Sequence, residues 1–188
     1  MRTETLTVYG AFSIKELLNR TESNGVYIYT FQHGDEYLAE WVGQTKRKFS
    51  TRAYDHLQAQ LEGKYNIYKV SDLKNGITTL LFDAESKPKP KDPAWIHFRE
   101  LQKENHELID AWRVFIIPTN FGERPRLRLE TGIAVNLLKH GKVVANILLP
   151  NARAKWLKDG TKRDDEEPVE VRIEPDKHIN GIPSKLAI

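Results

Sequence analysis

The chain has 188 residues, of which 39% are hydrophobic and 29% charged, with a net charge of +3. These values fit one globular domain with additions better than two separate domains. The sequence contains no cysteine, which excludes disulfides and thiolate metal sites and is consistent with a cytoplasmic location. No run approaches the roughly 18 apolar residues of a membrane helix, so we expect no membrane association.

The first predicted elements are a short helix and a β-hairpin. In the segment 11–20, Ser13 stands at a helix start and Glu16 follows three residues later, which is the pattern of a capping box. Two runs rich in β-branched and aromatic residues then flank a compact polar turn. This alternation predicts an antiparallel hairpin over residues 26–43.

One helix and a less regular region follow the hairpin. Apolar residues recur at helical spacing over 50–61, and Gly63 is placed to end that helix. Two stretches between residues 63 and 92 have extended character, and the second runs into a connector of lysines and prolines. A further helix is predicted over 94–110.

The second half of the chain begins with a strand and a helix. Residues 112–118 are almost all apolar, which is typical of a central strand. Pro125 precedes a helix that Gly141 would close. Beyond residue 150 the chain is charged and contains one predicted strand, at 169–173. The order strand, strand, helix, strand, helix indicates an α+β fold with a small, three-stranded, mainly antiparallel sheet flanked by helices.

Two aromatic-and-glycine tripeptides stand on the two strands of the predicted hairpin. An arginine and a histidine follow one turn apart on the next helix, so they share a face. The positions concerned, with a glutamate and an asparagine further on, are Gly25-Val26-Tyr27, Trp41-Val42-Gly43, Arg52, His56, Glu130 and Asn146. In combination and order they resemble the GIY-YIG nuclease superfamily.

The resemblance implies how the chain is organised. Residues 1–188 would form a single domain, whose catalytic core combines 25–61 with 112–147. The segment 62–111 would be a helical and extended insertion, and 148–188 a C-terminal extension.

The resemblance also implies a role for each matching residue in phosphodiester hydrolysis. Tyr27 would take a proton from the attacking water, and His56 would share a proton with Tyr27 or orient it. Arg52 offers a planar fork that matches phosphate oxygens. Glu130 would bind Mg²⁺ or Mn²⁺, since such an ion can use a single carboxylate with water and substrate phosphate. Asn146 would hold a backbone or substrate group.

Trp41 departs from the family pattern, in which the second tripeptide usually begins with tyrosine. An indole has one N–H donor and no hydroxyl, so it cannot accept or relay a proton. Tyr29 and Tyr37 are the candidates for supplying that hydroxyl. The departure keeps open a second hypothesis, a nucleic-acid-binding module of the same fold that has lost catalysis.

Two basic segments favour contact with a nucleic-acid backbone. One contains Lys46, Arg47 and Lys48, and the other contains Arg126 and Arg128. Such contacts add affinity that falls with salt. The alternative for both segments is an ordinary solvated surface, and Arg126 is also placed to pair with the glutamate one turn later.

The hypothesis from sequence is therefore a divalent-metal-dependent endonuclease that hydrolyses DNA. RNA as a substrate is not excluded. Cutting both strands requires two active sites or sequential nicking, so a homodimer is compatible with the hypothesis. A protein-interaction domain is the third alternative.

Overall fold

The computed structural model describes residues 2–84, 93–141 and 160–188. The helices and strands of these residues, in chain order, are β1 (Arg2–Phe12), α1 (Ile14–Leu18), β2 (Ser23–His33), β3 (Glu36–Lys48), α2 (Phe49–Leu61), β4 (Ile67–Tyr68), α3 (Val70–Leu73), β5 (Leu80–Phe82), α4 (Pro93–Glu100), α5 (Gln102–Ala111), β6 (Trp112–Pro118), α6 (Glu123–His140), β7 (Val169–Pro175) and β8 (Lys185–Ala187).

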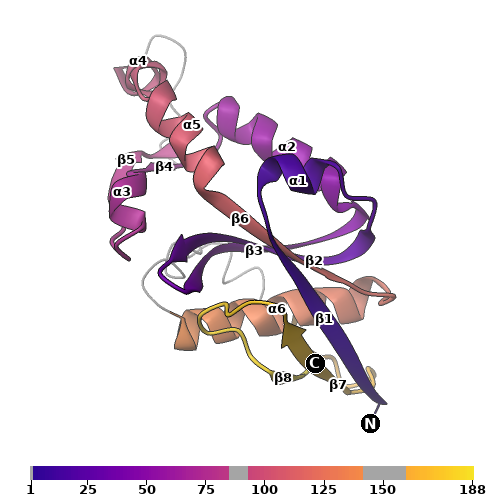
Figure 1. Ribbon diagram of the computed structural model, residues 1–188. Helices are drawn as coiled ribbons and strands as arrows, with labels where there is room; N and C mark the ends of the chain where they lie inside the picture. Colours follow the sequence, from indigo (N-terminus) through magenta and orange to yellow (C-terminus); the bar gives the residue numbers. More distant parts are fainter. Residues whose placement is uncertain (1, 85–92, 142–159) are drawn as a thin grey trace.

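The main sheet has six strands in the order β3-β2-β6-β1-β7-β8 and is curled (Figure 1). The prediction of a small three-stranded sheet is therefore wrong. The three predicted strands do lie side by side as β3, β2 and β6, but β1 pairs with the far edge of β6. β7 then runs parallel to β1, and β8 pairs antiparallel to β7. The class is mixed α+β, with β4 and β5 in a separate two-stranded sheet.

The β2–β3 hairpin confirms the predicted pairing and sets the register of the two tripeptides. Tyr27 lies opposite Gly43, and Tyr29 lies opposite Trp41. The register shifts after this pair, so Glu40 becomes the extra residue of a bulge.

Successive residues of β2 and β6 enter two different cores, one on each face of the sheet. The core on the α6 side contains Val26, Ile28, Phe115 and Ile117. The core on the α1 and α2 side contains Tyr27, Tyr29, Val114 and Ile116. Figure 1 shows α1 and α2 over one face and α6 against the other. This confirms the prediction that residues 112–118 form a strand inside the sheet.

The helices agree with the sequence patterns in part. The Ser13–Glu16 capping box is present at the start of α1, and α2 matches the helix predicted over 50–61. The single helix predicted over 94–110 is wrong, because Leu101 separates α4 from α5. The extended stretches predicted after α2 shrink to the short strands β4 and β5 with the helix α3 between them.

The segment between α2 and β6 is anchored to α2 by a buried amide pair. The Gln60 side chain donates to Oδ1 of Asn105 over 2.7 Å, and Asn105 Nδ2 donates back to the Gln60 carbonyl over 3.2 Å. Both side chains are buried, so this exchange fixes α5 against α2 at the end of the helix that carries Arg52 and His56.

The residues after 160 close the other end of the sheet. Arg124 and Arg128 of α6 both bind Glu166, which holds the loop before β7 on α6. The predicted strand at 169–173 is confirmed as part of β7. No helix in the described ranges is long and apolar enough to cross a membrane.

Candidate functional site

Both motif glycines leave space that a side chain would fill. A Cβ on Gly43 would lie 2.8 Å from Cε2 of Tyr27 and closer still to its hydroxyl. A Cβ on Gly25 would lie 2.9 Å from the Phe49 ring and closer still to the carbonyl oxygen of Ile117. The glycine opposite Tyr27 therefore lets the phenol lie across β3, and Gly25 lets β6 approach β2.

Tyr27 is the residue on which the candidate site converges. Its side chain is 3% exposed. The guanidinium Nε of Arg52 donates to the phenol oxygen over 3.0 Å, and Nε2 of His56 lies 2.9 Å from the same oxygen. Three residues predicted from separate parts of the motif thus meet at one hydroxyl.

The chemistry of these partners assigns the proton positions. Arg52 and Trp41 can only donate hydrogen bonds. Of the groups that the described part of the chain places on the Tyr27 hydroxyl, only Nε2 of His56 can accept its proton. We therefore infer that Tyr27 donates to Nε2 and that the neutral imidazole carries its hydrogen on Nδ1.

His56 is held neutral by its surroundings. Burial lowers its pKa to about 3, and the positive charge of Arg52 acts in the same direction. Its ring contacts those of Tyr27 and Tyr29, with centroids 5.5 and 5.2 Å away. Nδ1 lies 3.1 Å from the hydroxyl of Tyr65, which comes from the loop between α2 and β4.

Tyr65 was not among the predicted site residues. It lies outside the motif, in a stretch whose sequence predicts only an extended run. Nothing in that run distinguishes it from Tyr68, whose side chain enters the core beside α1 and α2. Only the fold of the α2–β4 loop brings Tyr65 to the histidine.

The neighbours of Tyr27 act on the pKa of its phenol in opposite directions. Burial raises its pKa, while the charge and hydrogen bond of Arg52 lower it. The negative charge of Glu130 raises the pKa again, and the nearby Trp41 side chain lowers it by a smaller amount. Tyr27 is therefore a protonated phenol at neutral pH, and Glu130 lies near enough to act on it.

Glu130 is the predicted metal ligand, and the described residues place no cluster of further ligands around it. The described ranges contain no group of three or more histidine, aspartate or glutamate side chains that could hold a metal ion. Glu130 is buried on α6, and its carboxylate acts on Tyr27. A single carboxylate with water and substrate phosphate is a coordination that suits Mg²⁺. Asn146 lies outside the described residues.

Trp41 lies at the junction of the two cores, because its partly buried ring packs against both. Of the two tyrosines considered as substitutes for a hydroxyl there, Tyr37 belongs to the opposite face and packs on Phe115. Tyr29 shares the face of Tyr27, with ring centroids 5.9 Å apart. Among the described residues no hydrogen-bond partner reaches the buried Tyr29 hydroxyl.

One of the two predicted basic segments is exposed in the structure, and the other is buried. Lys46, Arg47 and Lys48 are exposed at the end of β3, where Arg47 pairs with Asp55. They remain accessible to a nucleic-acid backbone.

Arg126 and Arg128 are buried instead, which corrects their assignment as surface contacts. Arg126 donates to Oε1 of Gln44 over 2.6 Å and also binds the side chain of Asn24. It thereby ties α6 to residues adjoining both motif glycines. Arg128 is held by Glu166 over 3.2 Å.

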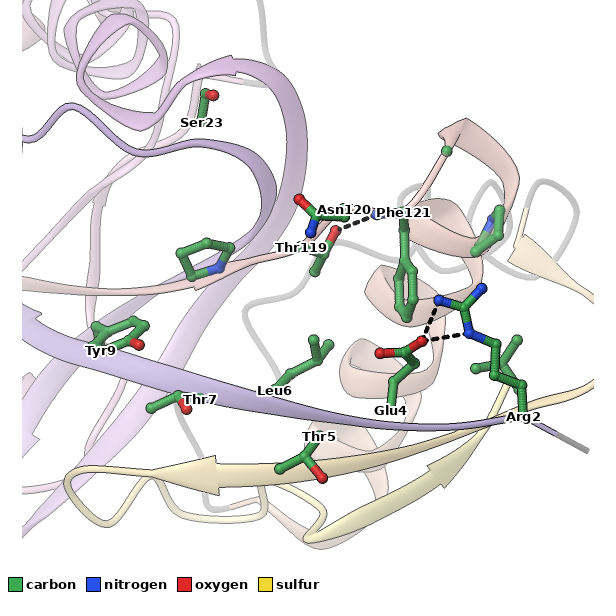
Figure 2. Close-up of a pocket in the computed structure, with 14 residues that line it drawn as sticks. Arg2, Glu4, Thr5, Leu6, Thr7, Tyr9, Ser23, Thr119, Asn120 and Phe121 are labelled. Atoms are coloured by element: carbon green, nitrogen blue, oxygen red, sulfur yellow. Dashed lines mark hydrogen bonds and ion pairs between the residues drawn. The ribbon is translucent and has the colours of Figure 1, made fainter.

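A separate cleft lies between β1, the end of β6 and the start of α6 (Figure 2). Its volume is about 560 Å³, and polar side chains including Thr5, Thr7, Thr119 and Asn120 line it. None of the residues that converge on Tyr27 is among its lining residues. The candidate site is therefore identified by its chemistry and not by this cleft.

No protein-family model, curated protein or solved structure matches the chain. The assignment of the site depends on the residues and their geometry alone.

Proposed function

We propose that the protein is a divalent-metal-dependent endonuclease that hydrolyses DNA phosphodiester bonds, with Tyr27 at the centre of its active site. The observation that carries the proposal is the convergence of Arg52 and His56 on the Tyr27 hydroxyl, at 3.0 and 2.9 Å. The same residues carry the resemblance to the nuclease motif in the sequence. A phenol with a donor on one side and an acceptor on the other is equipped to pass a proton.

In the proposed reaction, water attacks phosphorus as the bond from phosphorus to the leaving sugar oxygen breaks, and the leaving oxygen takes up a proton from solvent. The proton of the water passes to the phenol oxygen of Tyr27 while the phenol proton moves to Nε2 of His56. A concerted transfer is required because burial raises the pKa of Tyr27, so little free phenolate exists at neutral pH. Arg52 is partly exposed, and its Nη1 lies 3.6 Å from Oδ2 of Asp55. The remaining terminal nitrogen, Nη2, can face a phosphate while Nε stays on the phenol.

Glu130 would hold the metal ion. When bound, the ion would stabilise negative charge on the phosphate and the leaving oxygen. The charge of the carboxylate also adds to the effect of burial in raising the phenol pKa of Tyr27. Removing this charge by substitution should therefore weaken metal binding and lower the pKa of Tyr27 together.

The exposed residues Lys46, Arg47 and Lys48 follow the tripeptide that carries Gly43 and would contact the DNA backbone beside the site. A cytoplasmic nuclease, acting as a monomer by sequential nicking or as a homodimer, is the form that we propose. Single-stranded and structured RNA are substrates to be compared with DNA.

The test is cleavage of supercoiled plasmid at low salt with Mg²⁺, with Mn²⁺ and with EDTA. Tyr27→Phe and Glu130→Gln are compared with Tyr54→Phe, a matched substitution at an exposed tyrosine of α2. Metal-dependent nicking that is lost in the first two variants and kept in the third is expected. Genomic DNA is digested in parallel to supply any required recognition sequence. Equal cleavage by all variants, or no cleavage of either DNA, would contradict the proposal.

A catalytically impaired nucleic-acid-binding module is the second candidate, and Trp41 is the observation that favours it. Its indole stands where the resemblance calls for a phenol, so a proton-transfer group is missing there. Salt-sensitive plasmid binding without cleavage would identify this function. Introducing Trp41→Tyr would then be expected to produce metal-dependent nicking.

A protein-interaction domain is favoured by three exposed aliphatic side chains among the described residues between α2 and β6, which are Ile77, Leu80 and Ile96. Failure to bind DNA at any salt concentration would direct attention to these residues.

A further inference from the structure

Tyr65 stands at the open end of a hydrogen-bonded chain that begins at Tyr27. Its hydroxyl lies 3.1 Å from Nδ1 of His56, whose Nε2 lies 2.9 Å from the Tyr27 hydroxyl. The rings of His56 and Tyr65 are tilted by 33° with centroids 5.6 Å apart. Tyr65 is 37% exposed, whereas Tyr27 and His56 are 3% and 5% exposed. This series of hydrogen bonds therefore leads from the buried phenol of Tyr27 to the protein surface.

The position of Tyr65 is determined by the loop that carries it. Gly63 adopts a positive φ of 71°, which turns the chain back at the end of α2. The next residues are fixed through Asn66, whose carbonyl accepts from Gln60 over 3.2 Å and whose Oδ1 accepts from the Ala84 amide over 2.8 Å. Tyr65 is thus held between two anchored points on the side of α2 that bears His56.

A proton that reaches His56 cannot remain there. The imidazole is buried and lies beside the Arg52 cation; both conditions disfavour a second positive charge and outweigh the smaller, opposite effect of the Asp55 carboxylate. Proton transfer from Tyr27 to Nε2 therefore requires the hydrogen on Nδ1 to leave. The hydroxyl of Tyr65 is the described group within hydrogen-bond distance of Nδ1.

We propose that Tyr65 is the proton outlet of the site and completes a Tyr27–His56–Tyr65 relay to solvent. As the proton of the attacking water reaches the Tyr27 oxygen, the phenol proton passes to Nε2 and the Nδ1 proton passes to the Tyr65 oxygen. The original hydroxyl proton of Tyr65 leaves to water. One proton enters and one departs, so no member of the relay has to hold a charge. Tyr65 acts through His56 and is a positioning residue.

This inference rests on the proposed nuclease function, and the experiment separates the two. Plasmid cleavage is measured for the wild type, Tyr65→Phe, Tyr65→Ala and the exposed-tyrosine control Tyr54→Phe, with and without added imidazole. Tyr65→Phe should lower the cleavage rate about tenfold or more, since general acid–base groups typically contribute about 10²–10⁴-fold and this one acts at a remove. The control should match the wild type.

Imidazole should restore cleavage by Tyr65→Ala, because a small diffusing base can take the proton from Nδ1 through the space that the ring leaves. It should not accelerate the wild type. A purely structural defect would not respond to imidazole. Nitrogen-15 spectra of labelled histidine supply an independent readout: Nδ1 of His56 should be protonated in the wild type, with its resonance shifted in Tyr65→Phe.

Each of these measurements can contradict the proposed relay. Wild-type cleavage with an equally active Tyr65→Phe variant would overturn the relay and leave the nuclease function standing. A defect in Tyr65→Ala that imidazole leaves unchanged, or an unprotonated Nδ1 in the wild type, would also overturn it. Absence of wild-type cleavage on plasmid and genomic DNA would refute the nuclease function and the relay with it.

Discussion

Gly43→Ala is the substitution that most directly probes how the hairpin builds the site. The new Cβ would lie 2.8 Å from Cε2 of Tyr27, whereas ordinary contact begins at 3.4 Å. The ring would have to withdraw by more than about half an ångström, and its hydroxyl by more, because the hydroxyl is closer to the Cβ. Tyr27 is held 2.9 Å from His56 and 3.0 Å from Arg52, so this shift would bring the contacts near the roughly 3.5 Å limit of hydrogen bonding.

The expected loss of stability follows from two opposing effects. Overpacking a well-filled site typically costs about 1–3 kcal/mol. Replacing glycine by alanine restricts the unfolded chain, which returns about 0.4–1 kcal/mol. We therefore expect Gly43→Ala to lower the free energy of unfolding by about 1–2 kcal/mol. Cleavage should fall as well, because the Tyr27 hydroxyl leaves its partners.

Urea unfolding at 25 °C, followed by tryptophan fluorescence, measures this loss. Gly122→Ala is the control for an added Cβ that meets no neighbour, because nothing lies within 4 Å of a Cβ at that position. Gly122 is the N-cap of α6, where alanine is less favourable than glycine, so any loss in this control reflects the cap and should be smaller than the loss in Gly43→Ala. Repeating Gly43→Ala in a Tyr27→Leu background tests whether Tyr27 is the group in conflict. The cost should shrink there, since the clashing ζ carbon and hydroxyl are gone. An equal cost in both backgrounds would refute the reasoning.

Three further predictions concern charged and titratable groups. Burial raises the pKa of Glu40 to about 7, although a hydrogen bond from Trp112 acts in the opposite direction. The free energy of unfolding should therefore fall as the pH rises from 4.5 through 7. Glu40→Gln should remove this loss, and its free energy of unfolding in urea at pH 8 should exceed that of the wild type by about 1–3 kcal/mol. The pKa of His56 is lowered to about 3, so stability should instead decline as the pH falls below 6.5, and His56→Gln should flatten that limb of the same titration. Glu166→Gln should lower the melting temperature and speed hydrogen exchange at 161–167, because buried Arg128 loses its carboxylate, whereas the neighbouring Glu167→Gln should do neither.

The elements that frame the site were predictable because their signals are local. Alternating β-branched and aromatic residues predict the hairpin, and apolar spacing with Gly63 predicts α2. The i, i+4 spacing of Arg52 and His56 places both on one helix face, and both reach Tyr27. These inferences required only neighbouring residues.

The same local signals could not predict contacts between distant segments. Arg126 and Arg128 look like surface cations in sequence, but their partners Asn24, Gln44 and Glu166 lie 38 to 102 residues away. Burial of an arginine depends on whether such partners exist in the fold. The sequence of α6 alone contains no indication of them.

The prediction omitted half of the sheet, although the sequence contained a physical reason to expect more strands. In the predicted three-stranded sheet, with the two hairpin strands beside 112–118, this last strand would form an edge. Its side chains are apolar on both faces, since Val114 and Ile116 enter one core while Phe115 and Ile117 enter the other. Such a strand at an edge would expose an unpaired and aggregation-prone backbone. A further neighbour was therefore required, and β1 supplies it through Tyr9 and Phe12, beyond the alternation of buried Leu6 and Val8 in the part of β1 that pairs with β7. A nearly all-apolar strand with only one assigned partner is thus itself evidence that a sheet is incomplete.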